Sequence, residues 1–498
     1  MSTTITHFIN GVETAGHGDR HQPVYNPATG QVTGELRLAD RTDIDAVVAA
    51  AKAASAGWAE TSLTKRTAVL FRFRELLAAN VQELARVVTR EHGKVVSDAA
   101  GEVGRGLEVV EYACGAPQSL KGGYSDAVST GIDVFSFRQP LGVVAGITPF
   151  NFPVMVPLWM APVAIVTGNT FILKPSERDP SASLFLARLW KDAGLPDGVF
   201  NVLQGDKEAV DGLLTHPDVD GVSFVGSTPI ARHVHETATR HGKRVQALGG
   251  AKNHAVVMPD ADLDLAAEHI TAAAFGSAGQ RCMAISVAVA VGSAAENLVA
   301  RLKERAEAVK VANGMEPDAD MGPVITPNAR SRLQKIVGEA QEDGAALIVD
   351  GRELVVKGHE DGFFVGPTVL DHVRREMTAY REEIFGPVLA VLRVDSMEEA
   401  LEVINSNPYG NGTAIFTASG AYARAFTRGV RVGMVGINVP LPVPVAWHSF
   451  GGWNESLFGD HHIYGPDGVH FYTRGKVVTQ RWPEPTQLSG ASFAFPSS

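Results

Sequence analysis

From Leu141 onward the chain alternates short apolar runs with longer stretches of helical apolar periodicity. The apolar runs have the length of buried strands, and the periodic stretches have the spacing of amphipathic helices. The expected strands are GVVAGI (142–147), NTFILKP (169–175), VFNVLQG (199–205) and GVSFVGS (221–227), and the expected helices begin at Pro153, Ala182 and Lys207. Repeated units of strand and helix predict a parallel, doubly wound sheet.

Other patterns flank this region on both sides. Residues 8–35 are rich in Gly, Thr, Asn and Pro and predict short strands and turns, and helical periodicity follows over 42–60 and 62–92. A second alternation over 244–438 indicates a second α/β domain. The tail from Pro440 is dense in Gly, Pro and aromatic residues, so we expect it to pack on another surface, within the chain or in a partner subunit.

The composition fits a globular chain of several domains. The chain has 498 residues, of which 45% are hydrophobic and 20% charged. A chain of this length exceeds what one hydrophobic core supports, so two or three domains are expected. The net charge of -11 and the lack of a dense Lys/Arg block oppose a nucleic-acid or anionic-membrane surface. We therefore expect no nucleic-acid partner.

The chain shows no targeting or membrane signal. Its opening, MSTTITHFINGVETAG, has neither the basic start and apolar run of a secretory signal nor the Arg-rich character of a transit peptide. The most apolar stretch, 154–166, is too short to span a bilayer and is interrupted by Pro157 and Pro162. These features lead us to expect a cytoplasmic location and no contact with a membrane.

Cysteine and histidine usage limits the kinds of site that are possible. The chain has only two cysteines, Cys114 and Cys282, which excludes a disulfide framework and a cysteine-based metal site. The closest histidines, His461 and His462, lie in a Gly-rich loop without suitably spaced carboxylates or thiols, so we expect no metal. Any functional cysteine must therefore act as a thiol.

Cys282 is the candidate nucleophile. It ends the segment GSAGQRC, whose small residues suit a tight turn that a substrate can approach closely. A thiol has a pKa of about 8.5 and needs a positive or dipolar neighbour to ionise near neutrality, which Arg281 and the amides of a following helix are expected to supply. The alternative is that Cys282 is a small buried hydrophobic residue, as free cysteines often are.

Asn151 is the candidate donor to an oxyanion. It lies in ITPFNFP, between a predicted strand and a predicted helix, where free amides and the helix dipole stabilise negative charge. Its side-chain amide, together with the backbone amide of Cys282, would form an oxyanion hole. The alternative is that Asn151 caps the helix.

Two further segments suit a dinucleotide. Lys174 and Glu177 follow a strand, where ligands bind in doubly wound sheets, and both side chains can hold a ribose. Glu177 would accept from a 2'-hydroxyl and repel a 2'-phosphate, which favours NAD over NADP. Ser227 lies in FVGSTPIA, a strand, glycine turn and helix start that suits a pyrophosphate but is weak as a lone motif. Lys174 alone fits a solvated strand end equally well.

Taken together, these segments resemble the aldehyde dehydrogenase family from about residue 8 to about residue 480. The matching motifs are TPFNFP, KPSE, FVGST, GGAK in place of the family's ELGGK, GQRC, EIFGP (383–387), NPYG (407–410) and SFGG. The resemblance implies that Cys282 attacks an aldehyde, that Asn151 holds the oxyanion and that hydride passes to NAD. It implies cofactor contacts from Thr148, Phe150, Lys174, Glu177, Arg178, Ser227, Glu383 and Phe385.

The resemblance also implies a fold and an assembly. We expect a doubly wound, Rossmann-type NAD-binding domain from residues 1–120 and 140–248, and an α/β catalytic domain from 249–440. Residues 121–139 and 441–498 would form a β oligomerisation arm and the C-terminal tail. Arms of this kind add strands to a neighbouring subunit, so a homotetramer built as a dimer of dimers is expected.

One departure from the family pattern changes the expected reaction. Hydrolytic members carry a glutamate before the Leu-Gly-Gly-Lys run, and it activates the water that cleaves the acyl-enzyme; here Leu248 stands four residues before Lys252. Without a positioned base, attack by water loses roughly 10²- to 10⁴-fold. A thiol such as coenzyme A needs less help than water. The alternatives are a hydrolytic enzyme that recruits another base such as Glu383, and a binding protein without activity.

The details are most similar to an acylating branch, the methylmalonate-semialdehyde dehydrogenases. The matching segments are GQRCMA (279–284), GAKNH (250–254), VVMPD (256–260) and the tail FGDHHIYGPDGVHFYT. This branch converts methylmalonate or malonate semialdehyde to propionyl-CoA or acetyl-CoA with loss of carbon dioxide. The substrate carboxylate suits a guanidinium clamp, for which Arg281 and Arg105 are the candidates. The alternative for Arg105 is a salt bridge to Glu102 or Glu108.

Overall fold

A mostly parallel sheet of eight strands forms the first half of the molecule. The computed structural model describes residues 3–482. The sheet order is β22-β12-β11-β8-β9-β10-β2-β3, with β2, β3 and β22 antiparallel to their neighbours. The bounds are β2 (His7–Ile9), β3 (Val12–Thr14), β8 (Val143–Ile147), β9 (Thr170–Lys174), β10 (Phe200–Val202), β11 (Gly221–Val225), β12 (Arg244–Leu248) and β22 (Leu457–Phe458). The doubly wound sheet expected from the alternation is confirmed.

Helices cover both faces of this sheet because its strands are apolar on both sides. On β8, Val144 belongs to one apolar cluster and Val143 to another, as alternate strand residues must. The cluster of Val143 includes α1 (Arg41–Glu60), α8 (Lys207–Thr215) and α9 (Thr228–Arg240). The opposite cluster includes α2 (Leu63–Ala79), α3 (Val81–His92), α4 (Val96–Cys114), α5 (Ala116–Ser119), α6 (Met155–Val166) and α7 (Ser181–Asp192).

Two helix boundaries differ from the sequence pattern. The periodicity over 62–92 is interrupted at Asn80, where the backbone leaves the helical region and the side chain donates to the Leu76 carbonyl. The helix expected from Pro153 begins at Met155, because Val154 serves as its N-cap. Both differences concern ends of elements, which backbone and side-chain hydrogen bonds decide more than apolar spacing does.

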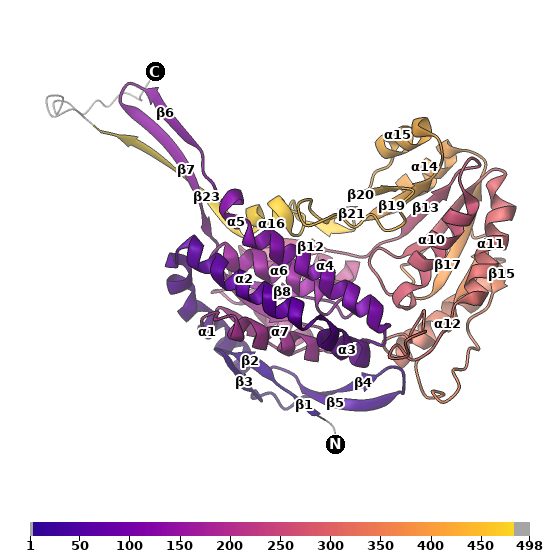
Figure 1. The fold of residues 1–498 in the computed structure, drawn as a ribbon, viewed down its shortest axis with the longest axis horizontal. Helices are drawn as coiled ribbons and strands as arrows, with labels where there is room; N and C mark the ends of the chain where they lie inside the picture. The colour runs from indigo at the N-terminus through magenta and orange to yellow at the C-terminus, as the bar shows by residue number, and fades with distance from the viewer. Residues whose placement is uncertain (1–2, 483–498) are drawn as a thin grey trace.

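The second half of the molecule has its own sheet of seven strands. Their order is β15-β16-β17-β14-β13-β19-β20, parallel except for β15. The strands are β13 (Asn253–Val257), β14 (Ile285–Val291), β15 (Ala346–Val349), β16 (Thr368–Asp371), β17 (Val388–Val394), β19 (Gly412–Phe416) and β20 (Met434–Ile437). The helices are α10 (Leu263–Phe275), α11 (Ala294–Ala308), α12 (Pro327–Glu342), α13 (Thr378–Arg381), α14 (Met397–Asn405) and α15 (Gly420–Gly429). Figure 1 shows the two sheet-and-helix bodies side by side.

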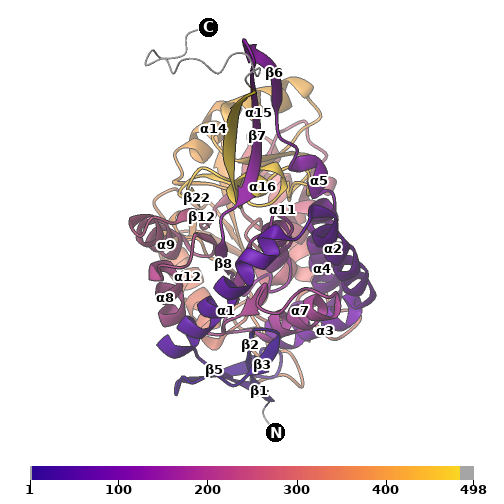
Figure 2. The ribbon, with the colours of Figure 1, turned by 90° about the vertical axis from the view of Figure 1, so that its left-hand side faces the viewer.

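Three small sheets complete the fold. One contains β1 (Thr3–Ile5), β4 (His21–Asn26) and β5 (Gln31–Arg37), and another pairs β18 (Tyr409–Gly410) with β21 (Trp453–Asn454). The third contains β6 (Tyr124–Ser129), β7 (Ile132–Pro140) and β23 (Thr473–Arg481), the last preceded by α16 (Gly465–Phe471). It extends away from the body of the molecule (Figures 1 and 2). The domain boundaries proposed from the sequence remain a prediction, and residues 483–498 of the expected tail lie outside the described residues.

The topology brings the motif-bearing loops to one edge of the first sheet. The loops after β8, β9 and β11 leave the carboxyl ends of neighbouring parallel strands, which is where ligands bind in such sheets. They carry the turn 148–154, residues 175–180 and Ser227. Among the helices of residues 3–482, none is both long enough and apolar enough to cross a membrane.

Candidate active site

The segment before Cys282 is a tight turn that only small residues allow. The 3-10 helix η1 (Gly276–Gly279) contains Ser277 and Ala278 in the left-handed region, with φ of 54° and 51°. A Cβ on Gly279, whose φ is 68°, would lie 2.1 Å from the Gly386 carbonyl oxygen. The turn therefore brings the Cys282 segment against the loop that follows Glu383, as the small residues of the sequence suggested.

Two asparagines fix the backbone of Cys282. The side-chain amides of Asn253 and Asn411 both donate to the Cys282 carbonyl oxygen, at 2.9 and 3.1 Å. Asn253 begins β13 and Asn411 lies between β18 and β19, so two strands of the second half hold the nucleophile segment. Sequence reasoning missed both asparagines.

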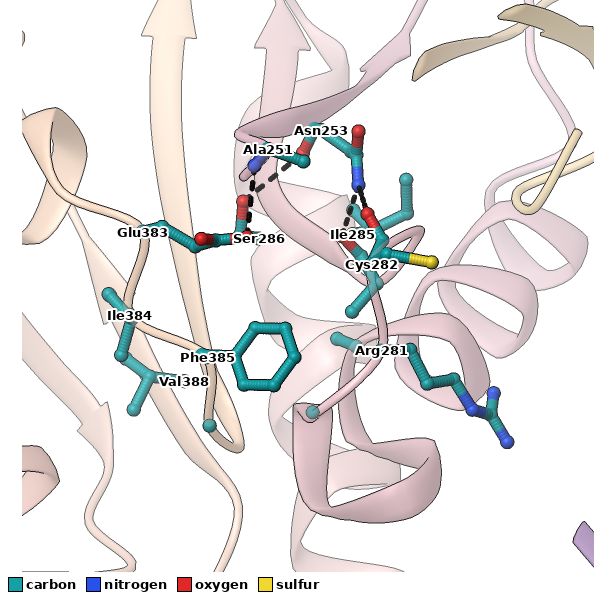
Figure 3. A pocket seen from close by; sticks show the side chains of 14 residues that line it. Ala251, Asn253, Arg281, Cys282, Ile285, Ser286, Glu383, Ile384, Phe385 and Val388 are labelled. Carbon is teal, nitrogen blue, oxygen red and sulfur yellow. Dashed lines mark hydrogen bonds between the residues drawn. The ribbon is translucent and has the colours of Figure 1, made fainter. Parts of the chain in front are cut away.

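Figure 3 shows the pocket around Cys282, which has about 330 Å³ of atom-free space. Arg281, Glu383 and Phe385 line it together with small apolar residues. The Cys282 sulfur and the Arg281 side chain point to one side, away from Glu383 and Phe385 (Figure 3). The pocket thus has a carboxylate and an aromatic ring on one side of the cysteine and a guanidinium on the other.

The expectation that Arg281 ionises Cys282 is wrong for this state of the protein. Burial raises the pKa of the Cys282 thiol to about 12, and the Glu383 carboxylate adds to the rise. Hydrogen bonds from the Cys282 and Met283 amides and the charge of Arg281 lower this pKa by less, and the Arg281 guanidinium pairs with Asp98 at 2.8 Å. The thiol is therefore neutral at physiological pH, and its ionisation needs a change in its surroundings.

Asn151 is buried in the turn that leads into α6, with 3% of the residue exposed. The helix-cap alternative is wrong, since Val154 is the N-cap of α6 and no side-chain cap is formed there. Within the described residues 3–482, no hydrogen bond engages the side-chain amide of Asn151. Cys282 packs against the large apolar cluster to which Phe152 of this turn belongs.

Lys174 and Glu177, the two residues predicted to hold a ribose, pair with each other. The Lys174 ammonium contacts the Glu177 carboxylate at 3.0 Å at the end of β9. Burial alone would raise the pKa of Glu177, but the charges of Lys174 and Arg178, together with hydrogen bonds from Lys174 and from the backbone, hold the pKa below its usual value. The carboxylate is therefore charged and able to accept from hydroxyl groups.

Other predicted cofactor residues surround this pair. The Thr148 hydroxyl is buried and has no partner among the described residues, so it is available to a ligand. The Phe150 ring lies 5.0 Å from the Arg178 guanidinium and edge-on to Phe385, with 5.8 Å between the ring centroids. Ser227 is the N-cap of α9 without a side-chain cap bond, which leaves first-turn amides free for an anion.

Glu383 lies on the same side of Cys282 as Phe385. Its carboxylate accepts from the Ala251 amide at 2.9 Å, and a Cβ on Gly250 would meet it at 2.4 Å. Burial raises the pKa of Glu383 to about 7, so the group is part neutral and part charged near neutrality. Phe385 has a left-handed φ of 56°, which turns the backbone sharply after Glu383.

Arg105 makes the salt bridge that was its alternative assignment. One guanidinium nitrogen contacts both Glu108 oxygens, at 3.0 and 2.8 Å, and the other donates to the Val443 and Pro444 carbonyls. Glu102, the other candidate partner, pairs with Lys94. Arg105 and Arg281 thus each hold a carboxylate of the protein itself in this structure, and a substrate carboxylate would have to replace or join it.

The family follows from comparison with known proteins. The aldehyde dehydrogenase family model matches residues 14–478. This chain belongs to that family. A malonate-semialdehyde dehydrogenase of Pseudomonas aeruginosa is 56% identical over 99% of both chains. The acylating, mitochondrial methylmalonate-semialdehyde/malonate-semialdehyde dehydrogenase of Homo sapiens is 47% identical over 99% of this chain and 92% of the human one. A solved Sinorhizobium meliloti protein complexed with NAD is 50% identical, with a TM-score of 0.96 over 97% of this chain and 99% of that chain.

This aldehyde dehydrogenase has no carboxylate where hydrolytic relatives of the family carry their base. Leu248 ends β12, is 2% exposed and packs in an apolar cluster. Lys252, four residues later, is buried and donates to the Ala379 and Glu382 carbonyls, both at 2.7 Å. The segment thus keeps the lysine of the family motif as Lys252, and the apolar Leu248 stands in place of the glutamate.

Lys94 and Asp98, two charged residues beside the site, escaped the sequence analysis, and Glu102 was considered there only as a partner of Arg105. Lys94, Asp98 and Glu102 follow one another at intervals of four residues at the start of α4. This spacing places the latter two on one face of the helix, which was the only signal available. Lys94 and Glu102 pair with each other, and Asp98 pairs with Arg281.

Proposed function

We propose that this aldehyde dehydrogenase oxidises malonate and methylmalonate semialdehyde with NAD, releases carbon dioxide and transfers the remaining acyl group to coenzyme A. The names of the P. aeruginosa and human relatives carry these activities. The observation that carries the proposal is the buried, apolar Leu248 at the position where hydrolytic relatives carry their base. The acyl-enzyme formed there lacks a base to activate water, so a thiol is the acceptor that needs least assistance.

The side chains would act in a defined order. The Cys282 sulfur attacks the aldehyde carbon, its proton leaves to solvent, and the resulting oxyanion accepts from the Asn151 side-chain amide and the Cys282 backbone amide. NAD, when bound, accepts the hydride that this carbon loses. The acyl group is then a thioester of Cys282.

Decarboxylation and transfer would use the same donors. The bond to the carboxylate breaks, its electrons pass to the thioester carbonyl as an enolate, and Asn151 again holds the oxygen. The α-carbon takes up a proton, and the sulfur of coenzyme A replaces Cys282 at the acyl carbon. The sum is one semialdehyde, one NAD and one coenzyme A converted to one acyl-CoA, one NADH and one carbon dioxide.

The residues present fit NAD. The partnerless hydroxyl of Thr148, the charged Glu177 beside Lys174 and the free amides after Ser227 offer a donor, a ribose acceptor and an anion site on adjoining loops. Glu177 would repel a 2'-phosphate. Phe150, Arg178, Glu383 and Phe385 would complete the cofactor contacts, as the sequence predicted.

We propose that Arg281 and Arg105 hold the substrate carboxylate. Both are only partly buried, with side chains 18% and 33% exposed, so an entering anion can reach them. Arg281 lies next to Cys282 and points to the same side as its sulfur (Figure 3). A bidentate pairing there would orient the aldehyde carbon toward the thiol.

Product analysis tests the proposal. Malonate semialdehyde, NAD and coenzyme A are incubated with the enzyme, and the products are identified by mass spectrometry beside a Cys282→Ala control. Acetyl-CoA that disappears in the control is the expected result. Free carboxylic acid formed at the same rate without coenzyme A would support the hydrolytic alternative with Glu383 as base.

We also propose a homotetramer of cytoplasmic location. The strands β6, β7 and β23 form a sheet that extends from the body, and most of the residues of β6 and β23 are exposed. Exposed strand edges pair readily with another chain, which supports an assembly through this sheet. Light scattering after size-exclusion chromatography should give four times the chain mass, and deletion of residues 124–137 should reduce it.

A further inference from the structure

A buried ion pair lies behind the turn that carries Asn151. The Lys94 ammonium and the Glu102 carboxylate are 2.8 Å apart, and the side-chain exposure of both is 0%. Lys94 lies just before α4 and Glu102 lies within it, and α4 packs along α6. The two charges are thus enclosed between the start of α4 and the turn that leads into α6.

The pair holds this turn at both ends. Lys94 donates to the Asn151 carbonyl oxygen at 2.5 Å, while one Glu102 oxygen accepts from the Val154 and Met155 amides at 2.7 and 3.1 Å. The second Glu102 oxygen accepts from Lys94. A cation thus holds the carbonyl at the start of the turn, and an anion holds the amides at the beginning of α6, where a negative charge is favourable.

Stability alone does not explain such a pair. Two charges out of water carry a large desolvation cost, and apolar residues of similar size are often as stable or more stable. What an apolar pair could not do is satisfy three backbone groups that belong to one short turn. The Phe152 ring, which lies 4.3 Å from the Lys94 ammonium in the same turn, adds a fourth contact. All these contacts converge on residues 151–155.

We propose that Lys94 and Glu102 are positioning residues that hold the Asn151 side-chain amide at the oxyanion site before the substrate arrives. This inference rests on the proposed role of Asn151. The two residues touch neither substrate nor Cys282, and they act by fixing the backbone whose side chain donates to the oxyanion. A preorganised donor stabilises charge without reorganisation during the reaction, and a misplacement of about 1 Å can cost about 100-fold in rate.

The principal test compares Lys94→Met with Lys94→Arg and with Lys243→Met. Lys243 is a matched control, because it is also buried and its ammonium also donates to backbone oxygen, here the carbonyls of His216 and Val219 in another part of the fold. For Lys94→Met we expect kcat to fall by about 100-fold while KM for the semialdehyde changes little. Lys94→Arg should recover most of the rate, and Lys243→Met should keep kcat within about threefold.

Two further readouts separate positioning from damage to the fold. NAD affinity and the rate of Cys282 alkylation by iodoacetamide should remain near the original values in Lys94→Met, since neither depends on the Asn151 amide. Glu102→Gln provides a milder variant, because its amide oxygen still accepts from Val154 and Met155 while the charge that orients Lys94 is lost. It should reduce kcat by less than Lys94→Met does, without changing alkylation.

The outcomes are distinct. Equal losses of kcat in Lys94→Met and Lys243→Met, or a parallel loss of NAD binding and alkylation, would overturn the positioning role. Asn151→Ala serves as the reference for the proposed function: full activity in that variant would remove the oxyanion role itself. A strong loss in Asn151→Ala with no loss in soluble, folded Lys94→Met would remove only the positioning pair.

Discussion

The two segments that are proposed to carry the reaction, the Asn151 turn and the Cys282 loop, differ in how ready they are for catalysis. The Asn151 turn, from the first sheet, is held by a buried ion pair, and its side-chain amide is free. The Cys282 loop, from the second half, has a firmly held backbone but a neutral thiol and an arginine turned to Asp98. The comparison indicates that the oxyanion side is preorganised, whereas the nucleophile side must change when ligands bind.

The largest loss of catalytic rate should follow a substitution in the Asn151 turn. Asn151→Ala removes one donor to the oxyanion, and loss of such a donor typically lowers kcat by about 10²- to 10³-fold. Alkylation of Cys282 should proceed at the original rate, because the thiol does not depend on this amide. Steady-state kinetics and iodoacetamide labelling of the same preparation check both statements. Slower labelling would show that the Asn151 turn and the Cys282 loop do not act independently.

A smaller effect should come from the arginine beside the nucleophile. Arg281→Met removes a charged hydrogen-bond partner of the substrate carboxylate, which is worth about 1.5–3 kcal/mol, or roughly 10- to 100-fold in KM. Propionaldehyde, which lacks the carboxylate, provides the control, and its KM should change by less than about twofold. Equal losses for both aldehydes would mean that Arg281 supports the loop and does not bind the substrate.

A several-fold change in the rate of Cys282 alkylation is expected when the Glu383 charge is removed. Burial and the Glu383 charge both raise the pKa of Cys282, so Glu383→Gln should lower that pKa and speed alkylation near pH 8. In the original enzyme without NAD, labelling should rise steadily from pH 7 to 10 with no plateau, because the thiol pKa lies near 12. A plateau near pH 8 would contradict the raised pKa of the Cys282 thiol.

The smallest effect is a change in the pH dependence of thermal stability, and it involves Glu91. Burial raises the pKa of Glu91 to about 7 from a usual value of 4.5. The folded state therefore holds this proton more tightly than the unfolded state, and the contribution is full below pH 4.5 and lost as pH rises through 7. Tm should fall by a few degrees more between pH 5 and 8 in the original enzyme than in Glu91→Gln. Identical pH profiles would exclude Glu91 as the titrating group.

Local patterns in the sequence predicted the architecture well. The strands β8, β9, β10 and β11 occur where apolar runs of strand length stand, and the Gly-rich turn before Cys282 has the conformation that its small residues suggested. The family resemblance is confirmed by the match over residues 14–478. The roles of the individual site residues remain predictions.

What the sequence could not supply were burial and long-range pairing. The ionisation expected of Cys282 assumed a free Arg281, but Asp98 comes close only when α4 packs beside the Cys282 loop. The pairing of Lys94 with Glu102 around Asn151 likewise depends on how α4 lies against α6. The contacts of Asp98 with Arg281 and of Lys94 with Asn151 join segments far apart in the chain, and no local spacing predicts them.

The most direct test of the central claim is the stoichiometry of NADH formation before coenzyme A is added. Enzyme with excess malonate semialdehyde and NAD is followed by rapid-mixing absorbance. Without a base to activate water, we expect a burst of about one NADH per active site, then near arrest, and steady turnover once coenzyme A is supplied. Continued turnover at the same rate without coenzyme A would contradict the account and show that water reaches the acyl-enzyme with another base.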